Sequence, residues 1–382
     1  MTDRDLLHLP GSRITEIGRL AFATPGVSFL CFGESDQGTP PPVIGAAVQA
    51  LQDGHTRYPD VRGLPALRQA LADYLTGIHA NPVAEDRIQI AASGMAAVSI
   101  TFAALLRPGD RVVMHTPAWP NIANAARIRG CEPEMLPLTA LSDGSFRLDL
   151  DRLARMLPGA RAFLLNSPNN PTGWTATREE LATILSLCRA HNVWLVSDEV
   201  YSRIVYDTEV APSILDAATP EDRVIVCNSF SKTWVMTGWR LGWLVLPAGT
   251  RDSFAEIVEV THSGVAPFIQ HAGVAATRQT ESVAAFREFC ARGRDMLGEA
   301  LSGINGVRYA APDGAFYGFV GIEGLTDSTA LARRLVLDHH VAVAPGAAFG
   351  PGGEGHLRVC FAQSEATLNR AVERLRAGLR AA

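Results

Sequence analysis

The chain has 382 residues, 47% of them hydrophobic, which is enough for more than one hydrophobic core. Its formal net charge of −5 is spread along the sequence without a basic run, so nucleic acid and anionic membranes are poor partners. The first residues carry two acids and no long apolar stretch, and no later segment approaches the ~20 apolar residues of a membrane span. We therefore expect neither a signal peptide nor a membrane segment.

The six cysteines lie far apart in the sequence, and no two of them form a Cys-x-x-Cys pair. This spacing is typical of reduced core residues and indicates neither a disulfide framework nor a zinc site. The neighbours His339 and His340 have no second ligand pair at a suitable spacing. We expect a cytoplasmic protein without a metal centre.

Short apolar runs alternate with helical patterns through the middle of the chain. The runs predicted as strands are residues 87–92, 111–115, 161–166, 193–197, 223–228 and 241–246. Between them, leucines recur at helical spacing from Leu64 to Leu75, and Thr177 with Glu180 forms the capping box of a further helix. Because the strands are apolar on both faces, the pattern predicts an α/β domain of three layers with a mostly parallel central sheet.

The C-terminal third has a different pattern. Residues 315–320 and 356–361 are predicted as strands, with a long helix at 284–301 before them and a helix through Leu368 and Leu379 after them. This order predicts a smaller α+β domain. We assign residues 39–280 to the large domain, and residues 1–38 and 281–382 to the small one.

Polar or aromatic side chains follow five of the predicted strands. In chain order they are Ser93-Gly94-Met95, Trp119, Asn170, Asp198 with Tyr201, and Ser229 with Lys232. Ligands of an open α/β sheet bind beyond the carboxyl ends of its strands. We therefore expect these side chains to meet at one edge of the sheet.

Lys232 follows Ser229 by three residues and precedes Arg240 by eight. A lysine of lowered pKa forms a Schiff base with an aldehyde, and arginine offers a planar fork of donors to a phosphate. A carboxylate at the end of a buried strand, such as Asp198, needs a partner, and a protonated pyridine nitrogen would serve. Each residue alone has a plainer reading, for example Ser93 as a helix cap or Asn170 in an ordinary turn.

Taken in order, these motifs resemble those of class I and II pyridoxal-phosphate-dependent aminotransferases, the fold type I enzymes related to aspartate aminotransferase. The matching motifs run from Phe32 to Ala362 and include Gly33-Glu34-Ser35-Asp36, Tyr58 with Gly63, Pro117-Ala118-Trp119, Asn169-Asn170-Pro171-Thr172-Gly173, Asp198-Glu199-Val200-Tyr201, Ser229-Phe230-Ser231-Lys232, Gly238-Trp239-Arg240, Gly314-Ala315-Phe316-Tyr317 and Arg358.

The resemblance implies a role for each of these residues. Lys232 would hold pyridoxal 5′-phosphate as a Schiff base and carry a proton during catalysis, while Asp198 would keep the pyridine nitrogen protonated. Tyr201 and Asn170 would hold the phenolate oxygen O3′, and Trp119 would stack on the ring. The residues implied for the phosphate are Ser93, Gly94, Met95, Ser229 and Arg240, joined by Tyr58 from a partner subunit. Those implied for the substrate are Arg358, which would grip its α-carboxylate, with Gly33, Asn170 and Trp119.

The resemblance also implies a homodimer with shared active sites and a ping-pong transfer of an amino group from an L-amino acid to a 2-oxo acid. Two departures stand out: Ser35 replaces the usual proline, and Met95 occupies the position where aspartate-using bacterial relatives carry a lysine. A thioether cannot bind a second carboxylate, which favours a donor that is not strictly dicarboxylic.

Two alternatives stay open. A carbon–sulfur β-lyase could use the same scaffold, and a non-catalytic regulatory module could use the same fold. The second is disfavoured because no helix-turn-helix pattern or basic patch precedes Gly33. A glycine-rich run at residues 350–355 has the spacing of a dinucleotide fingerprint, but it leads into a predicted strand rather than a helix, so we read it as a loop.

Overall fold

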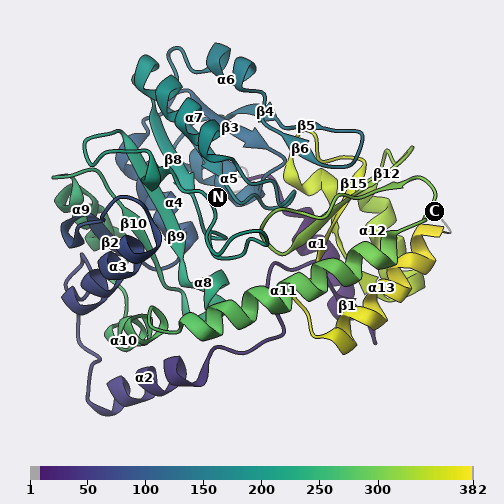
Figure 1. The fold of residues 1–382 in the computed structure, drawn as a ribbon, viewed down its shortest axis with the longest axis horizontal. Coiled ribbons are helices and arrows are strands. Elements are labelled where there is room, and N and C mark those ends of the chain that lie inside the picture. The colour runs from purple at the N-terminus through teal and green to yellow at the C-terminus, as the bar shows by residue number, and fades with distance from the viewer. Residues whose placement is uncertain (1–8, 381–382) are drawn as a thin grey trace, which may run out of the picture.

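The computed structural model describes residues 9–380 and contains a seven-stranded central sheet with helices on both faces (Figure 1). Across the sheet the strands are β2 (Ile88–Ala91), β10 (Gly242–Val245), β9 (Val224–Ser229), β8 (Trp194–Asp198), β7 (Ala162–Asn166), β3 (Val112–Thr116) and β4 (Glu134–Pro137). All six predicted strands are confirmed. The seventh, β4, was not predicted, because it is a short edge strand that is only partly buried.

Successive residues of the sheet point into different hydrophobic cores. Val113 and Phe163 belong to the core on one face, whereas Val112 and Leu164 belong to the core on the other. The first core is covered by α3 (Pro65–Ile78), α6 (Leu150–Met156), α7 (Arg178–His191) and α10 (Pro267–Ala276). The core on the other face of the sheet is covered by α4 (Gly94–Leu105), α5 (Pro120–Ile128) and α9 (Arg251–His262). This is the predicted three-layer arrangement.

Strand directions bring the predicted site residues to one edge. β3, β4, β7, β8 and β9 are parallel, whereas β10 runs antiparallel to both β9 and β2. β2 therefore has the same direction as β9. The carboxyl ends of the five strands named in the sequence prediction consequently lie along the same edge, with the antiparallel β10 inserted between two of them.

Helix α7 begins as its sequence predicts. The hydroxyl of Thr177 accepts a hydrogen bond from the Glu180 N–H at 3.1 Å, and a Glu180 carboxylate oxygen accepts one from the Thr177 N–H at 2.8 Å. This capping box satisfies two donors that would otherwise lack partners. The four-residue α8 (Phe230–Thr233) follows β9 directly.

A separate core, the second core, lies beside the sheet and holds both ends of the described chain. It is built from α1 (Arg13–Ala23), α11 (Thr280–Leu301), α12 (Ser328–His339), α13 (Glu365–Arg380) and a small sheet of β11 (Val307–Arg308), β12 (Tyr317–Ile322), β15 (His356–Cys360) and β14 (Ala344–Pro345). The parallel pair β1 (Ser28–Phe29) and β13 (Val341–Ala342) ties the N-terminal segment to it. The predicted C-terminal strands and helices are confirmed.

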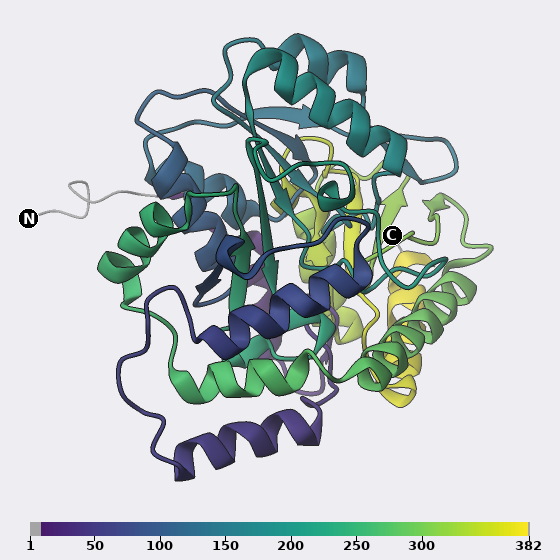
Figure 2. The same cartoon turned by 60° about the vertical axis from the view of Figure 1, so that its left-hand side comes forward.

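The long helix α11 runs from α10 toward this second region (Figure 1). The proposed division of the chain after residues 38 and 280 stays a prediction, and its first eight and last two residues lie outside the described part. Figure 2 shows α2 (Pro41–Gln52) at the margin of the molecule below α10. Within residues 9–380, no helix is both long and apolar enough to cross a membrane.

Candidate active site

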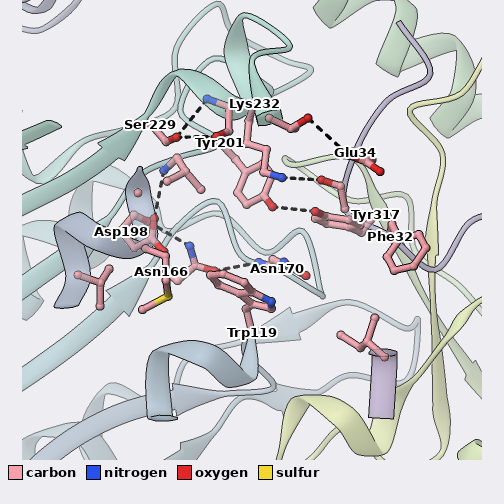
Figure 3. Close-up of a pocket in the computed structure, with 18 of the residues that line it drawn as sticks. Phe32, Glu34, Trp119, Asn166, Asn170, Asp198, Tyr201, Ser229, Lys232 and Tyr317 are labelled. Atoms are coloured by element: carbon pink, nitrogen blue, oxygen red, sulfur yellow. Dashed lines mark hydrogen bonds between the residues drawn. The ribbon is translucent and has the colours of Figure 1, made fainter. Parts of the chain in front are cut away.

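A cavity of about 360 Å³ opens at the carboxyl edge of the sheet, between the central sheet and the second core. Its lining residues are Ile14, Phe32, Gly33, Glu34, Gly94, Met95, Val98, Trp119, Asn166, Asn170, Asp198, Val200, Tyr201, Ser229, Ser231, Lys232, Thr237, Arg240, Tyr317 and Arg358. Figure 3 shows Asp198 on one side of Lys232, and Phe32 and Tyr317 on the other.

Lys232 lies in α8, immediately after β9, and is the only lysine in the 382-residue chain. Its Nζ donates a hydrogen bond to the Gly33 carbonyl. Burial lowers the pKa of this amine to about 8, with Cys360 opposing the shift and Arg358 adding to it. A buried amine of lowered pKa is a candidate nucleophile for a carbonyl carbon.

Asp198 ends β8 and is buried, and it forms no ion pair with any residue that the structure describes. Within the described part of the chain, its carboxylate accepts one hydrogen bond, from the Val200 N–H at 3.3 Å. Burial raises the pKa of the carboxyl group to about 7, with the Val200 hydrogen bond opposing the shift and nearby Glu199 adding to it. A carboxylate in this setting is stabilised by any cation that enters the cavity.

An anion-binding cradle forms where α4 begins beside β9. The first backbone N–H groups of α4 have no partner inside the helix, and Ser93 caps it by accepting a hydrogen bond from the Ala96 N–H at 3.0 Å. A Cβ on Gly94 would lie 3.1 Å from the Ser229 Cβ, so this helix start lies against the serine. The Ser229 hydroxyl and the Arg240 guanidinium complete a site suited to phosphate.

Asn170 and Arg358 meet inside the cavity although 188 positions separate them. Arg358 Nη1 donates a 3.0 Å hydrogen bond to Asn170 Oδ1, and its Nη2 donates to the Cys31 carbonyl. The third donor, Nε, is buried without a partner among the described residues. The guanidinium lies over the Tyr317 ring at 4.5 Å from its centroid, which holds the fork in a fixed plane.

Tyr201 and Tyr317 share a hydrogen bond of 2.7 Å between their Oη atoms. Burial raises the pKa of Tyr201 well above its usual value, so this phenol stays protonated. A Cβ on Gly33 would lie 2.3 Å from the Tyr317 hydroxyl. Only glycine therefore allows the N-terminal segment to pass this close to the tyrosine pair.

Eleven of the thirteen predicted site residues line this cavity, and two do not. The side chain of Ser93 caps α4 rather than facing the cavity. Tyr58 is 91% exposed on the outer surface of the chain. The lining residues that the sequence prediction did not name as site residues are Ile14, Phe32, Glu34, Val98, Asn166, Val200, Ser231, Thr237 and Tyr317.

Some of these omissions had a signal in the sequence. Asn166 ends a predicted strand, and Tyr317 lies in a recognised motif. Counting the lysines in the sequence would also have shown that Lys232 is the only one. Ile14 and Phe32 had no such signal, because both reach the cavity through long-range packing in the second core.

The remaining candidates have no place in the cavity. Residues 350–355 form a loop that leads into β15, as predicted. Among residues 9–380, no group of three or more histidine, cysteine or acidic side chains is arranged to hold a metal ion.

One cavity thus brings together a buried amine, a buried carboxylate, the anion cradle and a guanidinium fork. This set of groups is suited to an α/β enzyme that acts on amines and carbonyl compounds. Residues 26–375 match the family described as aminotransferase class I and II. The chain belongs to this family, whose members use pyridoxal 5′-phosphate, and the resemblance seen in its motifs is confirmed.

Individual relatives agree with this assignment. The chain is 34% identical to an arginine–pyruvate transaminase from Pseudomonas aeruginosa, over 91% of this chain and 89% of the relative. It is 33% identical to an aspartate aminotransferase from Pyrococcus horikoshii, over 98% and 96%. An aminotransferase structure from Mycobacterium tuberculosis superposes with a TM-score of 0.92 at 32% identity, covering all of both chains. The protein is a transaminase of fold type I, as predicted.

Proposed function

We propose that the cavity binds pyridoxal 5′-phosphate and that the enzyme moves an α-amino group from an L-amino acid to a 2-oxo acid by a ping-pong cycle. The observation that carries this proposal is the meeting of Lys232, Asp198, the anion cradle and Arg358 in one cavity of about 360 Å³. The cofactor would supply an aldehyde that takes the amine and a protonated ring that withdraws electrons.

The residues present fit this cofactor at both ends. Asp198 forms no ion pair within residues 9–380, and a pyridinium nitrogen would provide a cation for it. At the opposite end, Ser229, Arg240 and the start of α4 offer hydroxyl, guanidinium and backbone donors to a phosphate. Between the two, Trp119 would stack on the ring, while Asn170 and Tyr201 would donate to O3′.

Lys232 and Arg358 would act on the substrate. Lys232 Nζ would hold the cofactor aldehyde and, once released, would take the proton from the α-carbon of the donor. Arg358 would bind the α-carboxylate through its fork, helped by the Gly33 backbone and Asn170. The apolar wall of Ile14, Val98 and Val200 would keep bulk water from this reaction.

The donor, we propose, is not strictly dicarboxylic. The cations that line the cavity in the described chain are Lys232, Arg240 and Arg358, and each already has a proposed task. Met95 lies in the lining where a lysine would be needed to bind a second carboxylate. Ile14 and Phe32 add apolar surface at the same cavity, which suits a neutral donor with an apolar side chain.

A donor panel tests the reaction and its preference together. We expect neutral donors to bleach the visible band of the bound cofactor faster than aspartate, and the amine to appear in product only when a 2-oxo acid is added. Met95→Lys should raise kcat/KM for aspartate by about 5-fold relative to a neutral donor, which corresponds to the upper value of about 1 kcal/mol for an exposed charge pair. Release of ammonia and pyruvate without an added oxo acid would instead identify a β-lyase.

A shared active site in a homodimer is also part of the proposal. Ile44, Val48 and Leu51 are 44%, 47% and 45% exposed on α2, and Tyr58 follows on the loop. Three exposed apolar side chains at helical spacing are typical of a surface that another protein buries. A second copy of the chain would bury them and bring Tyr58 to the phosphate of its partner.

Hybrid dimers test this assembly. Tyr58→Ala should weaken cofactor binding, and Lys232→Ala should abolish turnover. Mixing the two variants should restore one complete site per hybrid dimer and recover activity at limiting cofactor. Absence of any recovery in verified hybrids would contradict a shared site.

We further propose a cytoplasmic location. All six cysteines are free and buried. Free thiols in this number are typical of a reducing compartment.

A further inference from the structure

His115 is a fully buried histidine near the end of β3 that has no part in the chemistry proposed above. Its Nε2 accepts a 2.9 Å hydrogen bond from the backbone N–H of Asn166. Its Nδ1 is buried without a partner among residues 9–380. Since Nε2 accepts, the hydrogen of the neutral ring is assigned to Nδ1. Burial lowers the pKa of His115 to about 4, so the ring keeps this acceptor at neutral pH.

The imidazole lies where two strands of the sheet separate. Pairing of β3 with β7 ends at Met114 and Leu164, whereas pairing of β7 with β8 continues to Asn166 and Asp198. The carbonyl of Thr116, the last residue of β3, accepts from the Leu138 N–H on the other side, at 2.6 Å. The Asn166 N–H therefore has a side chain as its acceptor in place of a strand carbonyl.

The Asn166 side chain is hydrogen-bonded to two residues that line the cavity. Its Oδ1 accepts from the Asn170 N–H at 2.9 Å, and its Nδ2 donates to the Asp198 carbonyl at 3.1 Å. Asn170 in turn accepts from Arg358 at 3.0 Å. Figure 3 shows Asn166 between Asp198 and Asn170.

We propose that His115 is a positioning residue of the active site, whose Nε2 holds Asn166 so that Asn166 sets the places of Asn170 and Asp198. The role rests on the proposed function, because Asn170 and Asp198 are the groups expected to contact the cofactor. It assigns a task to a side chain that touches neither cofactor nor substrate.

A packing role alone is the competing explanation. The His115 ring meets Trp174 edge-on, with centroids 5.6 Å apart and planes at 72°. If packing were its whole contribution, an apolar side chain of similar size would replace it with loss of stability only. The two explanations differ in whether the acceptor atom matters.

Three variants of the holoenzyme separate them. His115→Gln keeps an acceptor oxygen, His115→Met has a similar length without one, and Val113→Ala weakens the same strand on the same core face without touching Asn166. The measurements are KM for the amino donor, kcat, the melting temperature, and the midpoint pH of the visible cofactor band.

In His115→Met we expect KM to rise by about 5-fold, the size of one lost hydrogen bond. The band midpoint should move to higher pH, because an Asn170 that has shifted donates less to O3′. In His115→Gln, KM and the band midpoint should lie close to their wild-type values. Val113→Ala should lower the melting temperature and leave KM and the midpoint unchanged. A His115→Met enzyme with the wild-type KM and midpoint would overturn the proposal.

The hydrogen bond itself can be tested in the wild-type holoenzyme, so the proposal survives a variant that fails to fold. In ¹⁵N-histidine spectra, His115 is identifiable as the ring that stays neutral to the lowest pH, because burial lowers its pKa to about 4. We expect the tautomer protonated on Nδ1 and an acceptor shift on Nε2; the opposite tautomer would refute the role. Failure of the proposed function would show separately, as a cofactor band that does not respond to any donor.

Discussion

The two walls of the cavity are specified in different ways. On the large-sheet side, Asp198 ends a strand, and Asn170 and Lys232 follow strand ends. Parallel strands bring all three to one edge. On the opposite side, Arg358 reaches the Cys31 carbonyl across 327 positions, and α1 brings Ile14 through the second core. The first wall arises from local order along the chain and the second from long-range packing.

This difference indicates a division of labour. Groups on rigid strand ends would act on every substrate, because the cofactor and the reacting carbon are common to all of them. Groups assembled by the second core would act on the substrate rather than on the cofactor. Arg358 would bind the α-carboxylate that all donors share, and Ile14 and Phe32 would contact the donor side chain and select among donors. Changes in the strand-end wall should therefore act on turnover, and changes in the opposite wall should act on KM and on donor preference.

Lys232→Ala attacks the strand-end wall most directly. It should reduce turnover with every donor by about 10⁴-fold or more, the upper range for loss of a group that moves the reacting proton. The visible band of the bound cofactor should disappear while the melting temperature stays close to that of the wild type. A loss confined to one class of donor would contradict the division between the walls.

Arg358→Lys makes the corresponding test on the opposite wall. The substitution retains the positive charge and removes the paired donors of the guanidinium. Since a hydrogen bond to a charged group is worth roughly 1.5–3 kcal/mol, KM for the donor should rise by about 10- to 100-fold. The cofactor band should persist, since Arg358 is not among the groups expected to bind the cofactor. Disappearance of the band in this variant would mean that the two walls are not separable.

Asp198→Asn should reveal the missing cation through the pH dependence of stability. The folded pKa of Asp198, about 7, is raised above the usual value of 3.8, so the folded protein holds a proton that the unfolded chain releases. This contribution is fully present below the unfolded pKa and is lost as the pH rises through about 7.

Between about pH 4 and pH 7, the free energy of unfolding of the cofactor-free wild type should therefore fall by a few kcal/mol relative to that of cofactor-free Asp198→Asn. Urea unfolding measures both values. Bound cofactor should suppress the loss, because a pyridinium would pair with the carboxylate. If the two proteins differed in unfolding free energy by the same amount at both pH values, the pKa of Asp198 would not be raised in the folded protein, and the account of this carboxylate would be wrong.

Gly18→Ala tests the finer adjustment of the donor side. A Cβ at this position in α1 would lie 2.6 Å from Phe32 Cζ, so the ring must move. We expect KM for apolar donors to change by about 2- to 5-fold, as for a shift of one packed side chain of about 1 kcal/mol, with kcat little altered.

Gly77→Ala in α3 is the matched control, since its Cβ would meet nothing within 4 Å. It should stabilise the protein by about 0.5–1 kcal/mol without changing KM. If both variants changed KM equally, the contact between Gly18 and Phe32 would have no bearing on the donor.

The same contrast explains what could be predicted from the sequence. The runs from Ile88 to Val245 are apolar on both faces, so the strands and the edge where their ends meet could be predicted. Eleven of the thirteen named residues line the cavity. The antiparallel direction of β10 could not be predicted, because a hydrophobic pattern does not show in which direction a strand runs. Ile14, Phe32 and the hydrogen bond from Asn166 to His115 depend on contacts between distant segments, for which a single sequence contains no local signal.

Chemical trapping of the cofactor tests the central claim most directly. Borohydride fixes a lysine–aldehyde adduct, and Lys232 offers the only ε-amine in the chain. Peptide mass spectrometry after reduction of the holoenzyme should find the phosphopyridoxyl group on Lys232 alone, with activity lost in proportion to labelling. Complete reduction of the bound cofactor with Lys232 unlabelled would contradict the account.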